Sequence, residues 1–94
     1  MFIELTIIYP FKNTHSKIAD LLKKQKEDLL SSRKCVEYSI YNDTYLNKII
    51  HIIKWESKDT MKASISTKTH RKRLEEMLNL QKFPSEVYHL EEIE

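Results

Sequence analysis

The spacing of apolar residues in this chain predicts an α+β domain, a four-stranded antiparallel sheet built in the order strand, helix, strand, strand, helix, strand. Apolar residues alternate with polar ones in the predicted strands, whereas in the predicted helices they recur every three or four residues. A length of 94 residues with 40% hydrophobic content suffices for one core and leaves no room for a second. We therefore expect residues 1–94 to form a single domain.

The first two elements are predicted near the N-terminus. Residues 2–9 alternate in polarity as a strand does, and Pro10 ends the run. Either Asn13 or Thr14 can cap the helix that we expect over residues 15–31. The apolar residues on one side of that helix are Ile18, Leu21, Leu22 and Leu29.

A β-hairpin is predicted in the middle of the chain. Residues 35–41 and 45–55 are rich in β-branched and aromatic side chains, and they flank Asn42 and Asp43. Asn and Asp tolerate the positive φ of a tight turn, so these two residues are predicted to connect two antiparallel strands without a glycine.

The last third of the chain predicts helix followed by strand. Ser57 and Asp59 open a short helical segment, and a longer helix is expected over residues 69–80, with Pro84 beyond its end. Residues 86–93 complete the sheet as its fourth strand. The apolar face of the longer helix is predicted to comprise Leu74, Met77 and Leu78. This order of elements is that of a ferredoxin-like βαββαβ sandwich with both helices on one side of the sheet.

The third predicted strand is apolar on both faces, which predicts a second layer over the sheet. His51, Ile53 and Trp55 point to one side, while Ile50 and Ile52 point to the other. Leaving one such isoleucine in water forfeits about 1.5–3 kcal/mol. Because two helices can cover only one face, we expect a homodimer in which two sheets pack face to face.

Composition excludes several function classes. The chain has no glycine, so it has neither a phosphate-binding P-loop nor a GxGxxG nucleotide motif. Its single cysteine, Cys35, permits no internal disulfide, and its four histidines show no HxH or HxxxH spacing. We therefore expect no metal and no cofactor.

Charge and hydropathy argue against nucleic-acid and membrane partners. A net charge of +2 is too small to indicate nucleic acid. Much of the basic run at residues 68–73 is interpreted as a solvated helix face, because Arg71 and Lys72 each have a glutamate four positions later. Glu4 interrupts the first apolar run, so residues 1–9 do not resemble a signal peptide, and no apolar run approaches the ~20 residues of a membrane span. We expect a cytoplasmic protein.

The segment from His51 to His70 resembles the antibiotic biosynthesis monooxygenase (ABM) family. It contains an apolar strand that ends in Trp55-Glu-Ser, then a short helix, then a helix that opens near a histidine. Together with the order of elements, the resemblance covers nearly the whole chain. It implies a dimeric α+β barrel, a small-molecule pocket between sheet and helices, and cofactor-free oxygenation of phenols or quinols that themselves supply electrons to O2.

Two subgroups of the family are distinguished by particular positions. Haem-degrading members carry an asparagine in the first strand and a tryptophan and a histidine in the second helical segment, where this sequence has Ile7 or a neighbour, Ser64 and Leu74. The resemblance therefore argues against haem. Most other members carry a histidine where Ser64 stands, whereas His70 matches the histidine that follows.

His51 is the candidate catalytic base. An imidazole with an ordinary pKa near 6.5 can accept a phenolic proton at neutral pH, and the resemblance places a polar pocket residue here in some oxygenases. A buried histidine that is simply hydrogen-bonded in the core is the alternative.

Four further side chains are candidate substrate contacts: Trp55, His70, Tyr38 and Ser64. Trp55 suits either a pocket wall or ordinary packing, and His70 either the pocket mouth or the exposed first turn of a helix. The Tyr38 hydroxyl can reach a ligand, although cross-strand packing is the alternative.

Three functions follow from these residues. The leading prediction is a cofactor-independent monooxygenase acting on a small aromatic or quinol substrate. The alternative is a non-catalytic homodimeric module that binds a small hydrophobic metabolite, and an isomerase on the same scaffold is the third.

Overall fold

The computed structural model describes residues 1–93 and contains the predicted order of strands and helices. The ferredoxin-like α+β prediction is confirmed, and the short helical segment and the longer helix predicted after the third strand are both present. The elements are β1 (Phe2–Pro10), α1 (His15–Ser31), β2 (Glu37–Asp43), β3 (Lys48–Trp55), α2 (Lys58–Ile65), α3 (Lys68–Leu78) and β4 (Gln81–Glu91).

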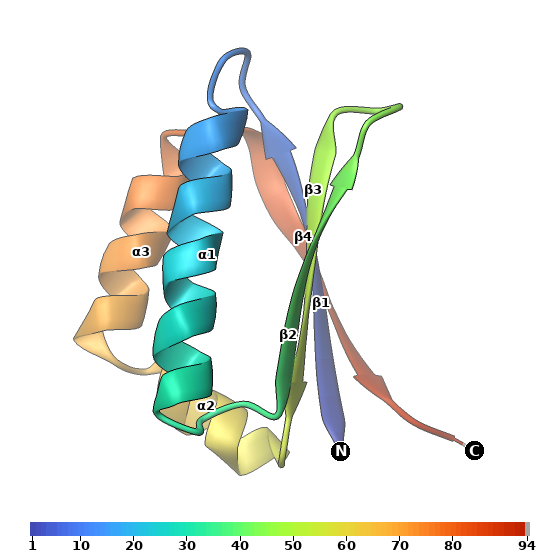
Figure 1. Ribbon diagram of the computed structural model, residues 1–94, viewed down its shortest axis with the longest axis vertical. Helices are drawn as coiled ribbons and strands as arrows, with labels where there is room; N and C mark the ends of the chain where they lie inside the picture. Colours follow the sequence, from blue (N-terminus) through green and yellow to red (C-terminus); the bar gives the residue numbers. More distant parts are fainter. Residues whose placement is uncertain (94) are drawn as a thin grey trace.

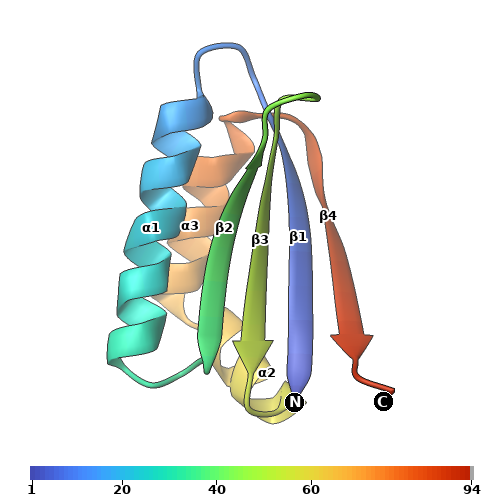
Figure 2. The ribbon, with the colours of Figure 1, turned by 45° about the vertical axis from the view of Figure 1, so that its right-hand side comes forward.

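The four strands form one antiparallel sheet in the order β2-β3-β1-β4. All three helices lie on the same side of this sheet, with α1 and α3 side by side across it and α2 near its lower end (Figure 1). Figure 2 shows the opposite side of the strands without any helix over it. We refer to the two sides as the covered face and the open face.

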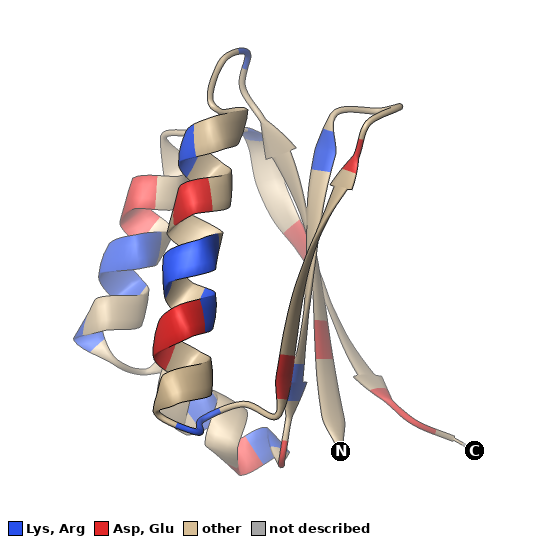
Figure 3. Cartoon of the chain, viewed as in Figure 1, with Lys and Arg blue, Asp and Glu red and all other residues tan. Residues whose placement is uncertain are grey.

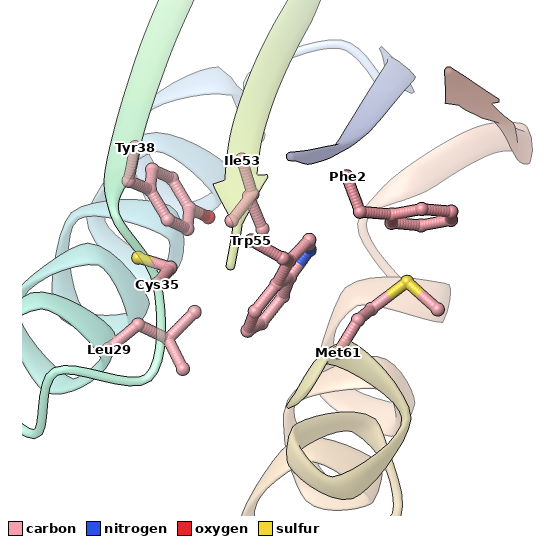
Figure 4. Packing of buried hydrophobic residues seen from close by; sticks show 7 residues of the cluster. All are labelled: Phe2, Leu29, Cys35, Tyr38, Ile53, Trp55 and Met61. Atoms are coloured by element: carbon pink, nitrogen blue, oxygen red, sulfur yellow. The ribbon is translucent and has the colours of Figure 1, made fainter. Parts of the chain in front are cut away.

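The core lies on the covered face in two apolar clusters. The first comprises Phe2, Leu29, Cys35, Tyr38, Ile53, Trp55 and Met61 (Figure 4). The second comprises Ile8, Ile18, Leu22, Ile49 and Met77. Between the two clusters, Thr6 of β1 pairs in register with His51 of β3, and both side chains are buried. The middle of the covered face is therefore polar, although its ends are apolar.

Two hydroxyl caps begin the helices that follow β3. The Ser57 side chain accepts a hydrogen bond from the backbone N–H of Thr60, as the sequence predicts for the start of α2. The Thr67 hydroxyl accepts from the N–H of His70 at 3.1 Å. This second cap fixes the first turn of α3, and with it the position of His70.

The hairpin turn was predicted at Asn42 and Asp43, and this is wrong. Both residues continue β2, where they pair with Ile49 and Lys48, and the turn occupies residues 44–47. The Asp43 carboxylate accepts hydrogen bonds from the N–H groups two and three positions later, and Asn47 takes the positive φ of 53°. The aspartate therefore stabilises a longer loop rather than forming the turn itself.

The last strand begins five residues earlier than predicted. β4 starts at Gln81, directly after α3, and runs through Pro84. The register between β1 and β4 shifts between Ile7 and Tyr9, so Pro84 lies at an irregularity of an edge strand, where its missing N–H is tolerated.

The predicted apolar face of α3 is only partly buried. Met77 is buried, but Leu74 and Leu78 are 51% and 65% exposed. The residues of α3 that face the sheet instead follow the spacing of His70, Arg73 and Met77.

The open face is apolar at its centre, and several of its polar side chains pair with one another toward its edges. Ile3, Leu5 and Ile7 of β1 lie beside Ile50 and Ile52 of β3, and no helix covers them. Toward the edges, Lys54 pairs with Glu37 at 3.2 Å. Charged residues are concentrated on the helices, whereas the strands are mostly neutral (Figure 3).

Polar side chains also pair at the β4 edge of this face. The Tyr9 and Tyr88 hydroxyls both donate to the Glu86 carboxylate, and these bonds hold the pKa of Glu86 below its ordinary value.

No helix among residues 1–93 is both long and apolar enough to cross a membrane.

Candidate functional site

His51 lies at the centre of the covered face and has an unsatisfied ring nitrogen. The side chain is 7% exposed, and its Nδ1 atom has no hydrogen-bond partner within residues 1–93. Burial disfavours the imidazolium and lowers the pKa of His51 from 6.5 to about 4, with a smaller contribution from neighbouring His70. The ring is therefore neutral at neutral pH and can accept a proton.

Tyr38 holds the His51 ring in place from behind. The two rings are stacked with centroids 5.6 Å apart and planes 18° apart. The Tyr38 hydroxyl donates to Gln25 Oε1 at 3.1 Å, and burial raises the pKa of the phenol. This contact from β2 to α1 fixes the orientation of His51 and leaves the Gln25 amide nitrogen as a hydrogen-bond donor.

An inner cavity of about 130 Å³ lies between the sheet and the helices at His51. Glu4 and Thr6 of β1 line it from the sheet, and apolar side chains from both the sheet and the helices α1 and α3 complete its wall. The apolar residues are Ile8, Leu22, Leu74, Met77 and Val87. Its volume is below the roughly 300–1,000 Å³ of most ligand pockets, so it matches a single small ring.

An outer cavity of about 290 Å³ adjoins the inner one toward the start of α3. Trp55 and Ser64 line it together with several hydroxyl side chains. The Trp55 indole N–H is buried without a hydrogen-bond partner in the described chain. In Figure 4 the six-membered ring of Trp55 points toward Leu29, and its nitrogen points to the side of Phe2.

Three side chains line both cavities and form the junction between them: Gln25, His70 and Arg73. Arg73 donates to the carboxylate of Asp28 on α1, which ties α3 to α1. Burial is the main cause that lowers the pKa of His70 below its ordinary value. Glu4 opposes this shift, and Arg73 adds to it.

The structure brings four of the five predicted site residues to the cavities. His51 lines the inner cavity, Trp55 and Ser64 line the outer one, and His70 lines both. Tyr38 lines neither cavity, because its ring lies behind His51.

Gln25 and Arg73 line the site but were not predicted from the sequence. Gln25 falls within the buried stripe of α1 that Ile18, Leu22 and Leu29 define, and a polar residue in an apolar stripe is a detectable signal. Arg73 lies four residues before buried Met77, so its spacing indicates an inward position. The charge pattern instead indicated a solvated basic run.

No cluster of three or more His, Cys, Asp or Glu side chains in the described part of the chain is arranged to hold a metal ion. The groups at the junction are instead those that bind organic oxygen atoms: a guanidinium, an amide and an imidazole. The site can therefore hold a small aromatic ring beside His51 and an oxygen-bearing group at the junction.

Comparisons with known proteins agree on the fold. No protein-family model matches the sequence, and no curated protein matches it. Solved structures match over the full chain. One antibiotic biosynthesis monooxygenase shares 12% identity with a TM-score of 0.88, and the match covers all of both chains.

Two further solved structures are similar over almost the whole chain. Rv0793 from Mycobacterium tuberculosis matches with a TM-score of 0.90 and 13% identity, over 99% of this chain and 95% of its own. SnoaB is a cofactor-independent oxygenase from Streptomyces nogalater, and its structure is that of the N63A mutant. It matches with a TM-score of 0.82 and 8% identity, over 99% of this chain and 94% of its own. The chain therefore has the ABM fold, and the resemblance is confirmed at the level of the fold.

Proposed function

We propose that this chain is a cofactor-independent monooxygenase that oxidises a small aromatic or quinol substrate on the covered face, with His51 as its base. The observation that carries the proposal is a buried, neutral histidine with an unpartnered ring nitrogen at a cavity between sheet and helices. Structural likeness to SnoaB, itself a cofactor-independent oxygenase, supports the same reaction class.

The reaction needs no electron source beyond the substrate. A hydroquinone and O2 give a hydroxyquinone and water: the quinol supplies four electrons, one oxygen atom enters the ring, and the other leaves as water. His51 takes the phenolic proton, which produces the electron-rich anion that reduces O2, and it returns a proton as the O–O bond breaks.

The lowered pKa of His51 shapes this step. A pKa of about 4 keeps the ring in its proton-accepting form, but it also makes the ring a weak base. The phenolate that forms beside the ring favours the imidazolium, because an opposite charge within about 4–6 Å raises the pKa of a histidine. Proton transfer is therefore coupled to close contact between the substrate hydroxyl and His51.

Oxygen uptake with a panel of hydroquinones tests the proposal. We expect reproducible consumption by the wild-type chain and a loss of about 100-fold or more in His51→Ala, as is typical for a general base. His15→Ala, which changes a histidine of α1 that lines neither cavity, is the matched control and should retain the activity. Consumption that is unchanged in His51→Ala would remove His51 from the mechanism.

A non-catalytic binding module is the second candidate function. The low basicity of His51 and the small inner cavity favour it, since both suit a bound neutral ring without proton transfer. Binding of hydroquinones without oxygen consumption supports this alternative. Conversion of a substrate without oxygen consumption would instead indicate an isomerase.

We also propose that the chain functions as a homodimer joined through its open face. The half-buried isoleucines and leucine of β1 and β3 form an apolar centre there, and no element of the described chain lies over it. A second copy in face-to-face contact removes this surface from water. The covered-face cavities then lie on the outer sides of the dimer.

A further inference from the structure

We infer that Arg73 and Gln25 form a carboxylate-binding subsite at the junction of the two cavities, and that the ligand is an aromatic ring bearing one carboxylate. The inference rests on the proposed aromatic site and specifies its substrate class. It assigns a specificity role to two residues outside the predicted site.

The junction carries more hydrogen-bond donors than acceptors. A guanidinium presents five N–H groups and no acceptor, and within residues 1–93 Asp28 receives a bond from Nη2 of Arg73. The Arg73 side chain is only 17% exposed, and within residues 1–93 its guanidinium makes no further hydrogen bond. Gln25 adds its amide N–H groups, because its Oε1 atom accepts from Tyr38. An acceptor-rich group at this point satisfies both side chains.

The charges around the junction balance, and this disfavours a dianion. Arg73 and Lys34 contribute two positive charges, while Asp28 and Glu4 contribute two negative ones. A dianion such as phosphate meets both carboxylates, whereas a single carboxylate matches the planar fork of one arginine. Asp28 is 54% exposed in its side chain, so its carboxylate can turn to solvent when a ligand takes its place.

The placement of the subsite orients the ring. Gln25 and Arg73 line the inner cavity as well as the outer one, so a carboxylate at the junction leaves its ring in the inner cavity. There the ring contacts apolar Leu22 and Met77, and its hydroxyl groups lie on the side of His51. A dihydroxybenzoate has this arrangement of one anion and two phenols.

Isothermal titration calorimetry without oxygen tests the subsite with two probes of nearly the same shape, 2,5-dihydroxybenzoate and 2,5-dihydroxybenzamide. We expect the wild-type chain to prefer the acid by about tenfold or more, which is the usual strength of one charge-assisted hydrogen bond. Arg73→Gln should abolish the preference, and Arg73→Lys should keep part of it.

Asp28→Asn should raise the preference for the acid, because it removes the anion that competes for Arg73. This change of opposite sign separates recognition from general damage. Arg71→Gln, two residues away on the exposed side of α3, is the matched control and should bind as the wild type does. Circular dichroism checks that each variant is folded. If Arg73→Gln is unfolded, the acid preferences of Arg73→Lys and Asp28→Asn test the subsite in its place.

Equal affinities for acid and amide in the wild type overturn the inference, as does a preference that survives in Arg73→Gln or the binding of neither probe. The proposed function is judged separately by oxygen uptake. If the chain binds the acid selectively but consumes no oxygen, the subsite is supported and the oxygenase is refuted. If it consumes oxygen with neutral hydroquinone but shows no preference for the acid, the oxygenase is supported and the subsite is refuted.

Discussion

The two faces of the sheet differ in which groups lack partners. On the covered face the apolar side chains are packed, but His51 Nδ1 and Trp55 Nε1 have no hydrogen-bond partner within residues 1–93. On the open face several polar side chains are paired, as in Lys54 with Glu37, but the apolar ones have no cover.

This difference indicates what each face binds. Buried polar groups without partners cost about 1–3 kcal/mol each, so they point to a polar ligand on the covered face. Exposed apolar strands point to an apolar partner, and a second copy of the same sheet supplies one. We therefore propose that the covered face binds the ligand and that the open face binds a second subunit.

A charge at the centre of the open face gives the largest expected effect. Ile52→Lys places an ammonium in the proposed interface, and a twofold dimer receives it twice. We expect the dissociation constant of the dimer to rise by at least about 100-fold. Size-exclusion chromatography with light scattering should show the mass fall from two chains to one.

Tyr45→Lys is the control for that change, because Tyr45 is 93% exposed at the hairpin turn and lies outside the interface. It should leave the mass at two chains. A wild-type protein that is monomeric at micromolar concentration would contradict the dimer.

Acid should destabilise the chain through the covered face. Unfolded His51 takes up a proton below its ordinary pKa of 6.5, whereas the folded ring stays neutral down to about 4. The unfolded state therefore binds more protons in this window, and the free energy of unfolding falls as the pH falls, by on the order of 3 kcal/mol. Urea titrations at fixed protein concentration measure it.

His51→Phe should flatten this pH dependence, since a phenylalanine cannot titrate. An equal slope in His51→Phe would show that His51 is solvated or hydrogen-bonded in the folded chain.

Trp55→Phe should have a smaller effect on stability than its burial suggests. The indole is 1% exposed, and a buried tryptophan changed to alanine usually costs about 3–5 kcal/mol. Phenylalanine keeps an aromatic ring and removes an unpartnered donor, so we expect a loss of about 1 kcal/mol. Urea unfolding followed by circular dichroism measures it, and a loss above about 3 kcal/mol would indicate a hydrogen bond to Trp55 in solution.

A change outside both faces provides the smallest effect and a baseline. Arg33 has a φ of 57° in the connection after α1, a conformation that favours glycine. Arg33→Gly should raise the free energy of unfolding by about 0.5–1 kcal/mol without altering dimer mass or ligand binding. An altered dimer mass would show that this connection takes part in assembly.

The sequence predicted the two faces because strand periodicity determines which residues share a side. His51 and Trp55 on one side and Ile50 and Ile52 on the other follow from alternation alone. The hairpin turn was misplaced because Asn and Asp favour turns equally well inside and next to a loop.

The start of β4 and the residues of the cavity junction could not be predicted from local sequence patterns, because both depend on neighbouring elements of the fold. Pro84 signals an end to regular structure, but an edge strand tolerates it. Arg73 was interpreted as solvated because its neighbours are, whereas its own spacing from Met77 turns it inward toward Asp28. Such a residue is recognised only when helix spacing is given more weight than charge.

Isoleucine methyl NMR tests the division between the faces most directly, because isoleucines lie on both. Hydroquinone should shift the methyl of Ile8, which lines the inner cavity, while dilution below the dimer dissociation constant should shift those of Ile50 and Ile52. Hydroquinone shifts confined to Ile50 and Ile52, with Ile8 unmoved, would contradict the account.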